Sequence, residues 1–206
     1  EPKVELAVAV GAPSAFPPVL SPVRLSVDAS GYEPDGRGEL FRPPFTTEPV
    51  LTDGGVYDNL GLETAWKRCE TVLVSDGGGQ MQPEGDVHAD WARHGLRVNA
   101  LIDNQVRSLR KRQTIEAFKS GERTGAYWGI RTDIADYDPP SPALSCPFDQ
   151  TQTLAATKTR LERMADPLQE RLINWGYAVC DAAIRTHVDR DKPVPAGFPY
   201  PNRGVA

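Results

Sequence analysis

The sequence predicts an α/β protein with a mostly parallel central sheet flanked by helices. Short apolar runs of the kind found in buried strands occur at residues 4–10, 71–75 and 126–130. Longer stretches, at residues 97–119 and 157–185, repeat their apolar side chains every three or four positions, which is typical of amphipathic helices. Because such strands and helices alternate along the chain, we expect them to form a parallel sheet with covering helices.

The first predicted element is a strand over residues 4–10 (VELAVAV). This run is almost continuously apolar and is followed by Gly11 and Pro13, so we expect a central strand that is buried on both faces. Residues 14–20 suit one short helical turn. Residues 23–27 (VRLSV) alternate apolar and polar side chains, which predicts a half-exposed strand.

A strand, a turn and a helix are predicted next. Residues 49–51 lead into the turn that Asp53 begins, and Asn59 offers a helix N-cap for residues 60–68. The strand at residues 71–75 (TVLVS) then ends in a second acidic turn, residues 76–79 (DGGG).

The remaining elements are a long helix, a strand and a further helical region. Residues 97–119 are predicted to form the long amphipathic helix, and residues 126–130 (AYWGI) are predicted to form the strand. Residues 157–185 keep a helical period that Pro167 interrupts, so two helices are expected there.

Composition excludes several classes of protein. The 206 residues include 23 Lys and Arg against 28 Asp and Glu, a formal charge of −5. This acidic balance argues against nucleic acid as a partner, because phosphate backbones are bound by an excess of basic side chains. The longest purely apolar run, residues 6–10, is far shorter than the ~20 residues of a membrane-spanning helix.

The acidic turn at residues 51–61 (LTDGGVYDNLG) is the strongest candidate for a catalytic site. Glycines at positions 54 and 55 allow a sharp turn directly after Asp53 and a close approach to its carboxylate, which suits a general base. An ordinary Asp-Gly turn is the simpler alternative. Asp76, which three glycines follow, has the same local form and competes with Asp53.

Three segments, residues 11–20, 53–61 and 171–181, together resemble the C-terminal half of bacterial patatin-like phospholipases. The resemblance implies a patatin-like fold and a lipid acyl hydrolase with a Ser-Asp dyad, whose serine lies in a G-x-S-x-G elbow after a Gly-rich oxyanion loop. The family's base maps onto Asp53, with Gly54 and Gly55 shaping its turn. Asp76 maps onto a strand end without an assigned role.

The resemblance also sets the expected domain organisation. Residues 1–192 would be the C-terminal part of the acyl hydrolase domain, and residues 193–206 a Pro-rich C-terminal tail.

The chain departs from this family in one essential feature. It contains no G-x-S-x-G and, before Asp53, no Gly-rich loop followed by a basic residue. Ser14 lacks flanking glycines, and we expect it to pack within a stretch of small residues. The first residue is Glu1 rather than Met. We therefore expect an N-terminal portion of the same protein to supply the first strands, the nucleophile and the oxyanion loop, and this chain alone to be inactive.

A Ser-Asp dyad requires neither a catalytic histidine nor a metal or organic cofactor. We expect no metal and no organic cofactor: His88 and His94 have no third ligand at a metal-binding spacing, and the three histidines are expected on the surface. The three cysteines, at positions 69, 146 and 180, form no C-x-x-C pair and are expected to be free and mostly buried.

The expected partners are a phospholipid or another acyl ester, and a membrane surface contacted peripherally. The protein would be cytoplasmic or membrane-peripheral in a bacterium. The densest basic run consists of Arg107, Arg110, Lys111 and Arg112. It suits a solvated helix face or, alternatively, contact with anionic lipid headgroups.

Two other functions stay open. The chain could be a non-catalytic lipid-binding or interaction module that lacks the nucleophile. Less favoured is a phosphate-cradling loop at residues 76–79, because it lacks the G-K-[ST] ending that supplies a lysine and a metal-binding hydroxyl.

Overall fold

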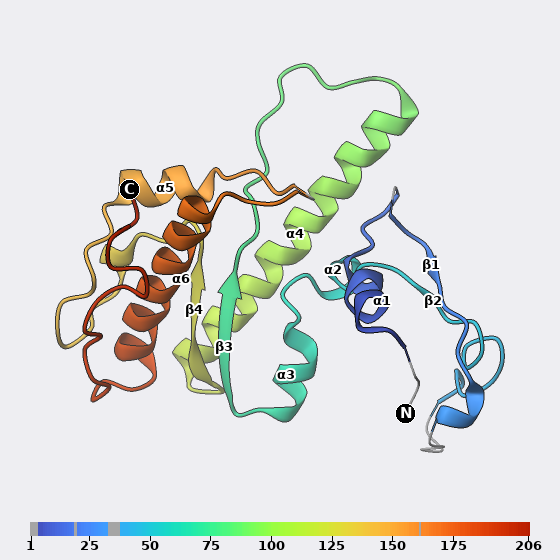
Figure 1. Cartoon of the computed structure of the whole chain (residues 1–206), viewed down its shortest axis with the longest axis horizontal. Helices are drawn as coiled ribbons and strands as arrows, with labels where there is room; N and C mark the ends of the chain where they lie inside the picture. Colours follow the sequence, from blue (N-terminus) through green and yellow to red (C-terminus); the bar gives the residue numbers. More distant parts are fainter. Residues whose placement is uncertain (1–3, 19, 33–37, 161) are drawn as a thin grey trace. The chain divides into compact units, whose positions relative to one another are not determined.

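The computed structural model describes residues 4–18, 20–32, 38–160 and 162–206 (Figure 1). The chain divides into two compact units, Glu1–Glu63 and Thr64–Ala206. Each unit is described by itself.

The first unit combines short helices with one small sheet. Its helices are α1 (Leu6–Gly11), η1 (Ala12–Ser14), η2 (Ala29–Gly31) and α2 (Gly55–Asp58). Strands β1 (Val23–Arg24) and β2 (Val50–Leu51) pair antiparallel, with Val23 opposite Leu51. Helix α3 (Leu62–Arg68) begins at the end of this unit and continues into the second.

The prediction of a buried central strand at residues 4–10 is wrong. Leu6–Gly11 form helix α1, and none of its residues is buried. A strand needs a hydrogen-bonded neighbour, and within the described residues no strand lies beside this segment. The backbone therefore satisfies its own hydrogen bonds as a helix. Short apolar runs fit either structure, so periodicity alone does not separate them.

The other predictions for the first unit are correct in part. The strand predicted at residues 23–27 is present only as β1, and the helical turn predicted at residues 14–20 lies earlier, as η1. The helix predicted from residue 60 begins at Leu62 as α3, because Gly61 adopts a left-handed conformation with φ of 60°. Asn59 is therefore the C-cap of α2 and not an N-cap.

The second unit has the α/β character that the sequence predicts, with a small parallel sheet and several helices. Its elements in chain order are β3 (Thr71–Asp76), α4 (Trp91–Ser120), β4 (Thr124–Gly129), η3 (Ile134–Asp136), α5 (Phe148–Ala155) and α6 (Asp166–His187). Strands β3 and β4 run parallel and in register, from Thr71 opposite Thr124 to Asp76 opposite Gly129.

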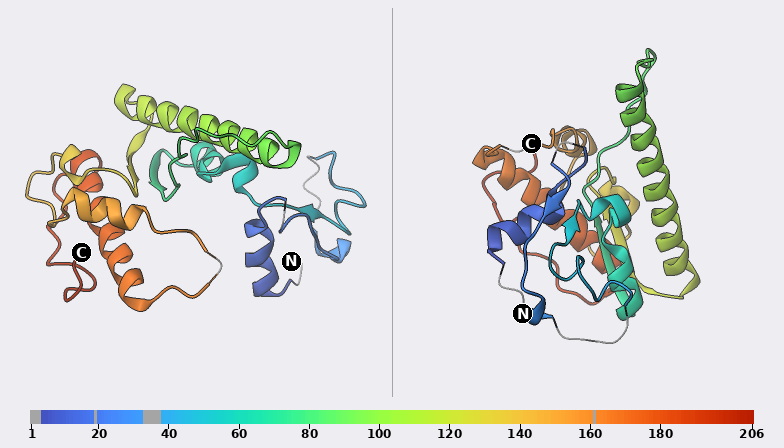
Figure 2. Two further views of the ribbon diagram at one scale, coloured as in Figure 1. Left: turned by 90° about the horizontal axis from the view of Figure 1, so that it is seen from above. Right: turned by 90° about the vertical axis from the view of Figure 1, so that its right-hand side faces the viewer.

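Helices cover both faces of β4, as Figures 1 and 2 show. On one face, Lys111 of α4 places its Nζ 4.7 Å from the centre of the Tyr127 ring. On the other face, Ala126 and Trp128 belong to a core cluster that α5 and α6 complete. Alternate strand residues thus face α4 and α6, as expected for a strand between two layers.

The long helix is confirmed and is longer than predicted. α4 begins after Asp90, whose side chain accepts a hydrogen bond of 2.9 Å from the backbone N–H of Arg93. It ends at Ser120, and its C-cap Gly121 adopts a left-handed conformation with φ of 76°. These are typical signals at the two ends of a helix.

The prediction of two helices within residues 157–185 is wrong. Residues 157–160 and 162–165 are not helical, and Pro167 lies in the first turn of α6, where its missing N–H costs no hydrogen bond. The proline therefore begins a helix and does not interrupt one. Helix α5, which lies before this region, was not predicted.

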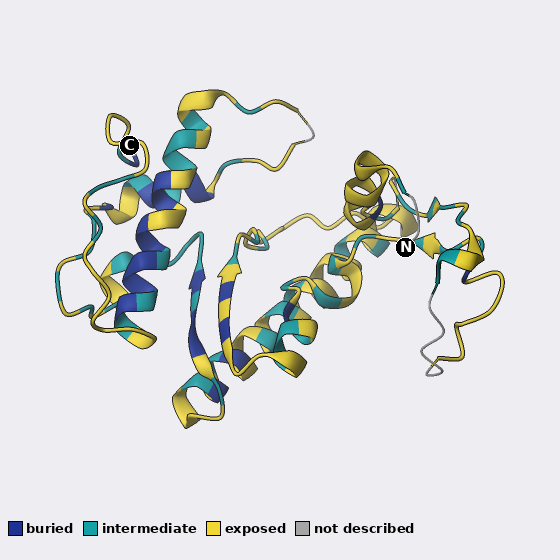
Figure 3. Cartoon of the chain, turned by 60° about the horizontal axis from the view of Figure 1, so that its bottom comes forward, coloured by how far each residue is buried: buried dark blue, intermediate teal, exposed yellow. Residues whose placement is uncertain are grey.

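The core of the second unit lies along α6, as the burial colours of Figure 3 show. Trp175 is only 2% exposed and donates its indole N–H to the carbonyl of Ile130 at 2.9 Å. Its neighbour Asn174 donates to the carbonyls of Tyr200 and Gly204, at 2.9 and 2.8 Å, and accepts from the N–H of Tyr200 at 2.9 Å. The Pro-rich C-terminal residues are thus attached to α6.

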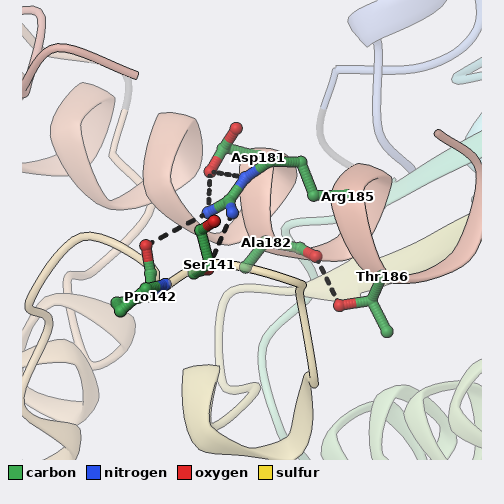
Figure 4. Close-up of polar contacts among 6 residues, drawn as sticks. All are labelled: Ser141, Pro142, Asp181, Ala182, Arg185 and Thr186. Atoms are coloured by element: carbon green, nitrogen blue, oxygen red, sulfur yellow. Dashed lines mark hydrogen bonds and ion pairs between the residues drawn. The ribbon is translucent and has the colours of Figure 1, made fainter. Parts of the chain in front are cut away.

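A buried ion pair attaches a second loop to α6 (Figure 4). The side chains of Asp181 and Arg185 are 8% and 1% exposed, and the shortest distance between their charged groups is 2.7 Å. Arg185 also donates to the carbonyl of Ser141 at 2.8 Å. Because the guanidinium bonds both a carboxylate and the loop backbone, its burial is compensated.

Among the helices that the structure describes, none combines the length and apolar character needed to cross a membrane.

Candidate active site

Asp53 lies in the first unit, in the turn between β2 and α2. Its Oδ1 accepts a hydrogen bond of 2.7 Å from the backbone N–H of Gly55. The backbone N–H groups of Asp53 and Gly54 donate to the carbonyls of Ala15 and Pro13, at 3.0 and 3.1 Å. The loop around η1 therefore holds the aspartate in place through its backbone.

The second carboxylate oxygen of Asp53 has a different environment from the first. Within residues 4–18, 20–32, 38–160 and 162–206, no hydrogen bond or ion pair reaches Oδ2. The residue is half-buried. A fixed carboxylate with one uncommitted oxygen is able to accept a proton from a hydroxyl placed beside it.

The two glycines after Asp53 differ in what surrounds them. A Cβ added to Gly55 would lie 2.9 Å from Oδ1 of Asp53 and 3.1 Å from the side-chain oxygen of Asn59. A Cβ at Gly54 would meet no other atom within 4 Å. Close approach to the carboxylate thus requires a glycine at position 55, whereas position 54 has room for a side chain.

Ser14 lies between the two residues that anchor the aspartate turn. The expectation that it packs among small residues is wrong, because it is exposed and its hydroxyl donates to the carbonyl of Val10 at 3.1 Å. A nucleophile elbow is a strained turn. In the described part of the chain only glycines have positive φ, so Ser14 does not adopt such a geometry.

Asp76, the competing acid, lies at the end of β3 in the second unit, as predicted. Its Oδ1 accepts from the N–H of Gly78 at 2.8 Å, and its Oδ2 accepts from the hydroxyl of Tyr127 at 2.6 Å. Burial raises the pKa of Tyr127 well above its usual value, and the hydrogen bond to Asp76 adds to this effect. Both oxygens of Asp76 are engaged, which makes it less suited than Asp53 to act as a base.

A polar cleft of about 670 Å³ opens beside Asp76, at the carboxyl ends of β3 and β4. Sequence reasoning missed this cleft. Its lining includes Arg107 and Lys111 of α4 and Arg131, which follows β4. The signal that could have revealed it is the spacing of four polar residues along one face of the predicted helix, at positions 104, 107, 108 and 111.

The structure also divides the basic run of α4. Arg107 and Lys111 line the cleft, while Arg112 is exposed outside it.

All three histidines are exposed, as expected. The three cysteines are free as expected, but Cys69 is exposed and only Cys146 is fully buried.

No residues are assigned to a metal. Among the residues with described positions, no three His, Cys, Asp or Glu side chains gather closely enough to hold a metal ion.

The chain matches no protein-family model, no curated protein and no solved structure.

Proposed function

We propose that the chain is the base-bearing part of a patatin-like lipid acyl hydrolase, in which Asp53 activates a serine. The observation that carries the proposal is the arrangement of Asp53: one carboxylate oxygen is fixed by the Gly55 N–H, and the other accepts no hydrogen bond from the described residues. A serine hydroxyl is a poor nucleophile unless a neighbouring base takes its proton.

The reaction follows ordinary acyl transfer. Asp53 takes the serine proton as the serine oxygen attacks the ester carbonyl, and the proton passes to the leaving alcohol as the acyl-enzyme forms. Asp53 then takes a proton from water, the hydroxide attacks the acyl-enzyme, and the fatty acid leaves as the serine regains its proton.

The nucleophile is assigned outside these 206 residues. The chain has no G-x-S-x-G, and Ser14 lacks the strained turn that such a serine needs. The proposal therefore requires an N-terminal portion of the same protein to contribute the serine and the oxyanion donors. The substrate is a phospholipid or another acyl ester, which the enzyme would reach at a membrane surface.

Asp53→Asn in the natural full-length protein tests the proposal. The amide keeps the shape of the turn but removes the base, so we expect ester hydrolysis to fall about 10²–10⁴-fold. Asp28→Asn is the matched control, because Asp28 also accepts a backbone N–H within an exposed turn of the same unit, that of Ser30 at 2.9 Å. Normal turnover by the Asp53→Asn protein would refute the assignment.

A fluorophosphonate probe separates the enzyme from the alternative. The full-length protein should form a covalent adduct at one serine, and Asp53→Asn should slow that labelling. A protein that hydrolyses no ester and labels at no serine would contradict the enzyme and favour the non-catalytic lipid-binding or interaction module.

A further inference from the structure

We propose that the cleft at the carboxyl ends of β3 and β4 binds the phosphate group of a phosphoester, with Arg107 and Lys111 as its cationic ligands. The site lies entirely within the second unit. It does not rest on the acyl hydrolase proposal, because none of its residues takes part in the chemistry assigned to Asp53.

The position of the cleft favours a ligand site. In sheets with parallel strands, ligands bind outside the carboxyl ends of the strands, where the loops diverge. Asp76 ends β3, Gly129 ends β4, and both line the cleft. Its volume of about 670 Å³ suits a small organic molecule.

The cations of the cleft are not neutralised by ion pairs. Arg107 donates to the carbonyl of Gly79 at 2.7 Å, and the Lys111 ammonium lies over the Tyr127 ring. Arg131 donates to Gln152 and to the carbonyl of Ala155, at 3.4 and 3.3 Å. Within the part of the chain that the structure describes, none of the three cations forms an ion pair with a carboxylate.

Three carboxylates line the cleft and equal the three cations in number. Two of them accept hydrogen bonds from the backbone of their own loops. Asp76 accepts from Gly78 and Tyr127, as described above, and Asp133 accepts from the N–H of Ala135 at 3.0 Å. The third, Asp136, is exposed at the end of η3. Among the described residues, none of these carboxylates accepts a hydrogen bond from Arg107, Lys111 or Arg131, so the cations keep N–H donors for a ligand.

The glycine loop after Asp76 adds backbone donors. Its Gly79 and Gln80 line the cleft, and no hydrogen bond among the described residues uses their N–H groups. Free N–H groups of a glycine-rich loop are common phosphate ligands. The sequence alone disfavours phosphate binding by this loop because no lysine ends it. In the structure, Arg107 and Lys111 from neighbouring turns of α4 provide the positive charges instead.

Arg107 is also closely fitted to the loop. A Cβ added to Gly78 would overlap Nη1 of Arg107. Gly78→Ala should therefore displace the guanidinium from Gly79 without removing any charge, which gives a second, independent variant for the test.

The test is a titration of the ¹⁵N-labelled 206-residue chain with glycerol 3-phosphate, followed by NMR, with glycerol as the uncharged reference. We expect saturable shifts of the Gly79 and Gln80 amides with the phosphoester only. Arg107→Ala and Lys111→Ala should each weaken binding about tenfold, as the loss of a charge-assisted hydrogen bond predicts, and Gly78→Ala should weaken it in the same direction.

Arg112→Ala is the matched control, since it removes the same charge from an exposed position of the same helix. The absence of a saturable shift, or an equal loss of binding in Arg112→Ala, would overturn the proposal. Competition by phosphatidic acid vesicles, but not by neutral phosphatidylcholine vesicles, would identify a lipid headgroup as the phosphate source. Binding of glycerol 3-phosphate without such competition would identify a free phosphoester.

Discussion

The hydroxyl of Tyr127 donates a hydrogen bond of 2.6 Å to Oδ2 of Asp76 and thereby connects the last residue of β3 to the neighbouring parallel strand β4. This contact makes the hydrogen bonding of Asp76 different from that of Asp53. Asp76 has both oxygens bonded, and it shapes the wall of the cleft. Asp53, with the same Asp-Gly-Gly sequence, has one oxygen that accepts no hydrogen bond from the described residues. The same local sequence therefore places the two carboxylates in different hydrogen-bonding environments.

Tyr127→Phe should destabilise the second unit by about 1–2 kcal/mol, because Oδ2 of Asp76 loses its donor in a half-buried position. Urea unfolding followed by hydrogen exchange of β3 and β4 amides would measure the change in the free energy of unfolding. Tyr177→Phe is the control, since Tyr177 is exposed on α6. Equal effects of the two substitutions would show that the bond to Asp76 contributes nothing.

Arg185→Met should lower the free energy of unfolding by about 3–5 kcal/mol, because it leaves the carboxylate of Asp181 buried without a partner. Arg163→Met breaks an exposed pair with Asp166 and should cost about 0–1 kcal/mol. Thermal unfolding compares the two variants. If the double substitution of Asp181 and Arg185 by apolar residues were no more stable than Arg185→Met, the unpaired charge would not be the cause.

Asn174→Ala should release the C-terminal residues from α6, because it removes three hydrogen bonds to Tyr200 and Gly204. We expect faster cleavage by a non-specific protease within residues 193–206 and a loss of about 2–3 kcal/mol in stability. Asn202→Ala, at an exposed position of the same segment, should change neither quantity. Unchanged cleavage in Asn174→Ala would contradict the structural role of these bonds.

The cysteines should differ in reactivity. Burial raises the pKa of the Cys146 thiol to about 11, so only about 0.1% of it is thiolate at pH 8. Cys69 is exposed. Iodoacetamide should therefore alkylate Cys69 first and Cys146 last, which mass spectrometry of timed samples would show. In urea the three rates should converge, and rapid alkylation of Cys146 in the folded protein would be inconsistent with its burial.

The parts of the fold that the sequence predicted are those specified by local pattern. β3, α4 and β4 follow from a β-branched run, a helical period and a second apolar run. The strand predicted at residues 4–10 is wrong because the conformation of this segment depends on whether a neighbouring strand is present to pair with it.

The two candidate sites also differ in whether the sequence alone can reveal them. The Asp53 turn is a continuous motif, so its residues are visible in the sequence. The cleft is not, because its lining comes from the loop after β3, one face of α4 and the segment after β4. The basic residues of α4 suggested headgroup contact, but only the three-dimensional structure shows which of them share a cavity with the glycine loop.

His187, at the end of α6, gives the chain a pH dependence with a definite sign. Although His187 is exposed, its ring centre lies 5.9 Å from that of Tyr137, and the partial loss of solvation lowers the pKa of His187 below its usual value of 6.5. The unfolded chain therefore binds a proton at a higher pH than the folded chain does. This contribution to stability is complete above the unfolded pKa and is lost as the pH falls through the folded one. Replacing His187 by Gln should remove that part of the slope of stability against pH, measured by urea unfolding between about pH 5 and pH 8. An NMR titration of the imidazole should give a midpoint below 6.5 in the folded protein, and a midpoint above that value would reverse the predicted sign.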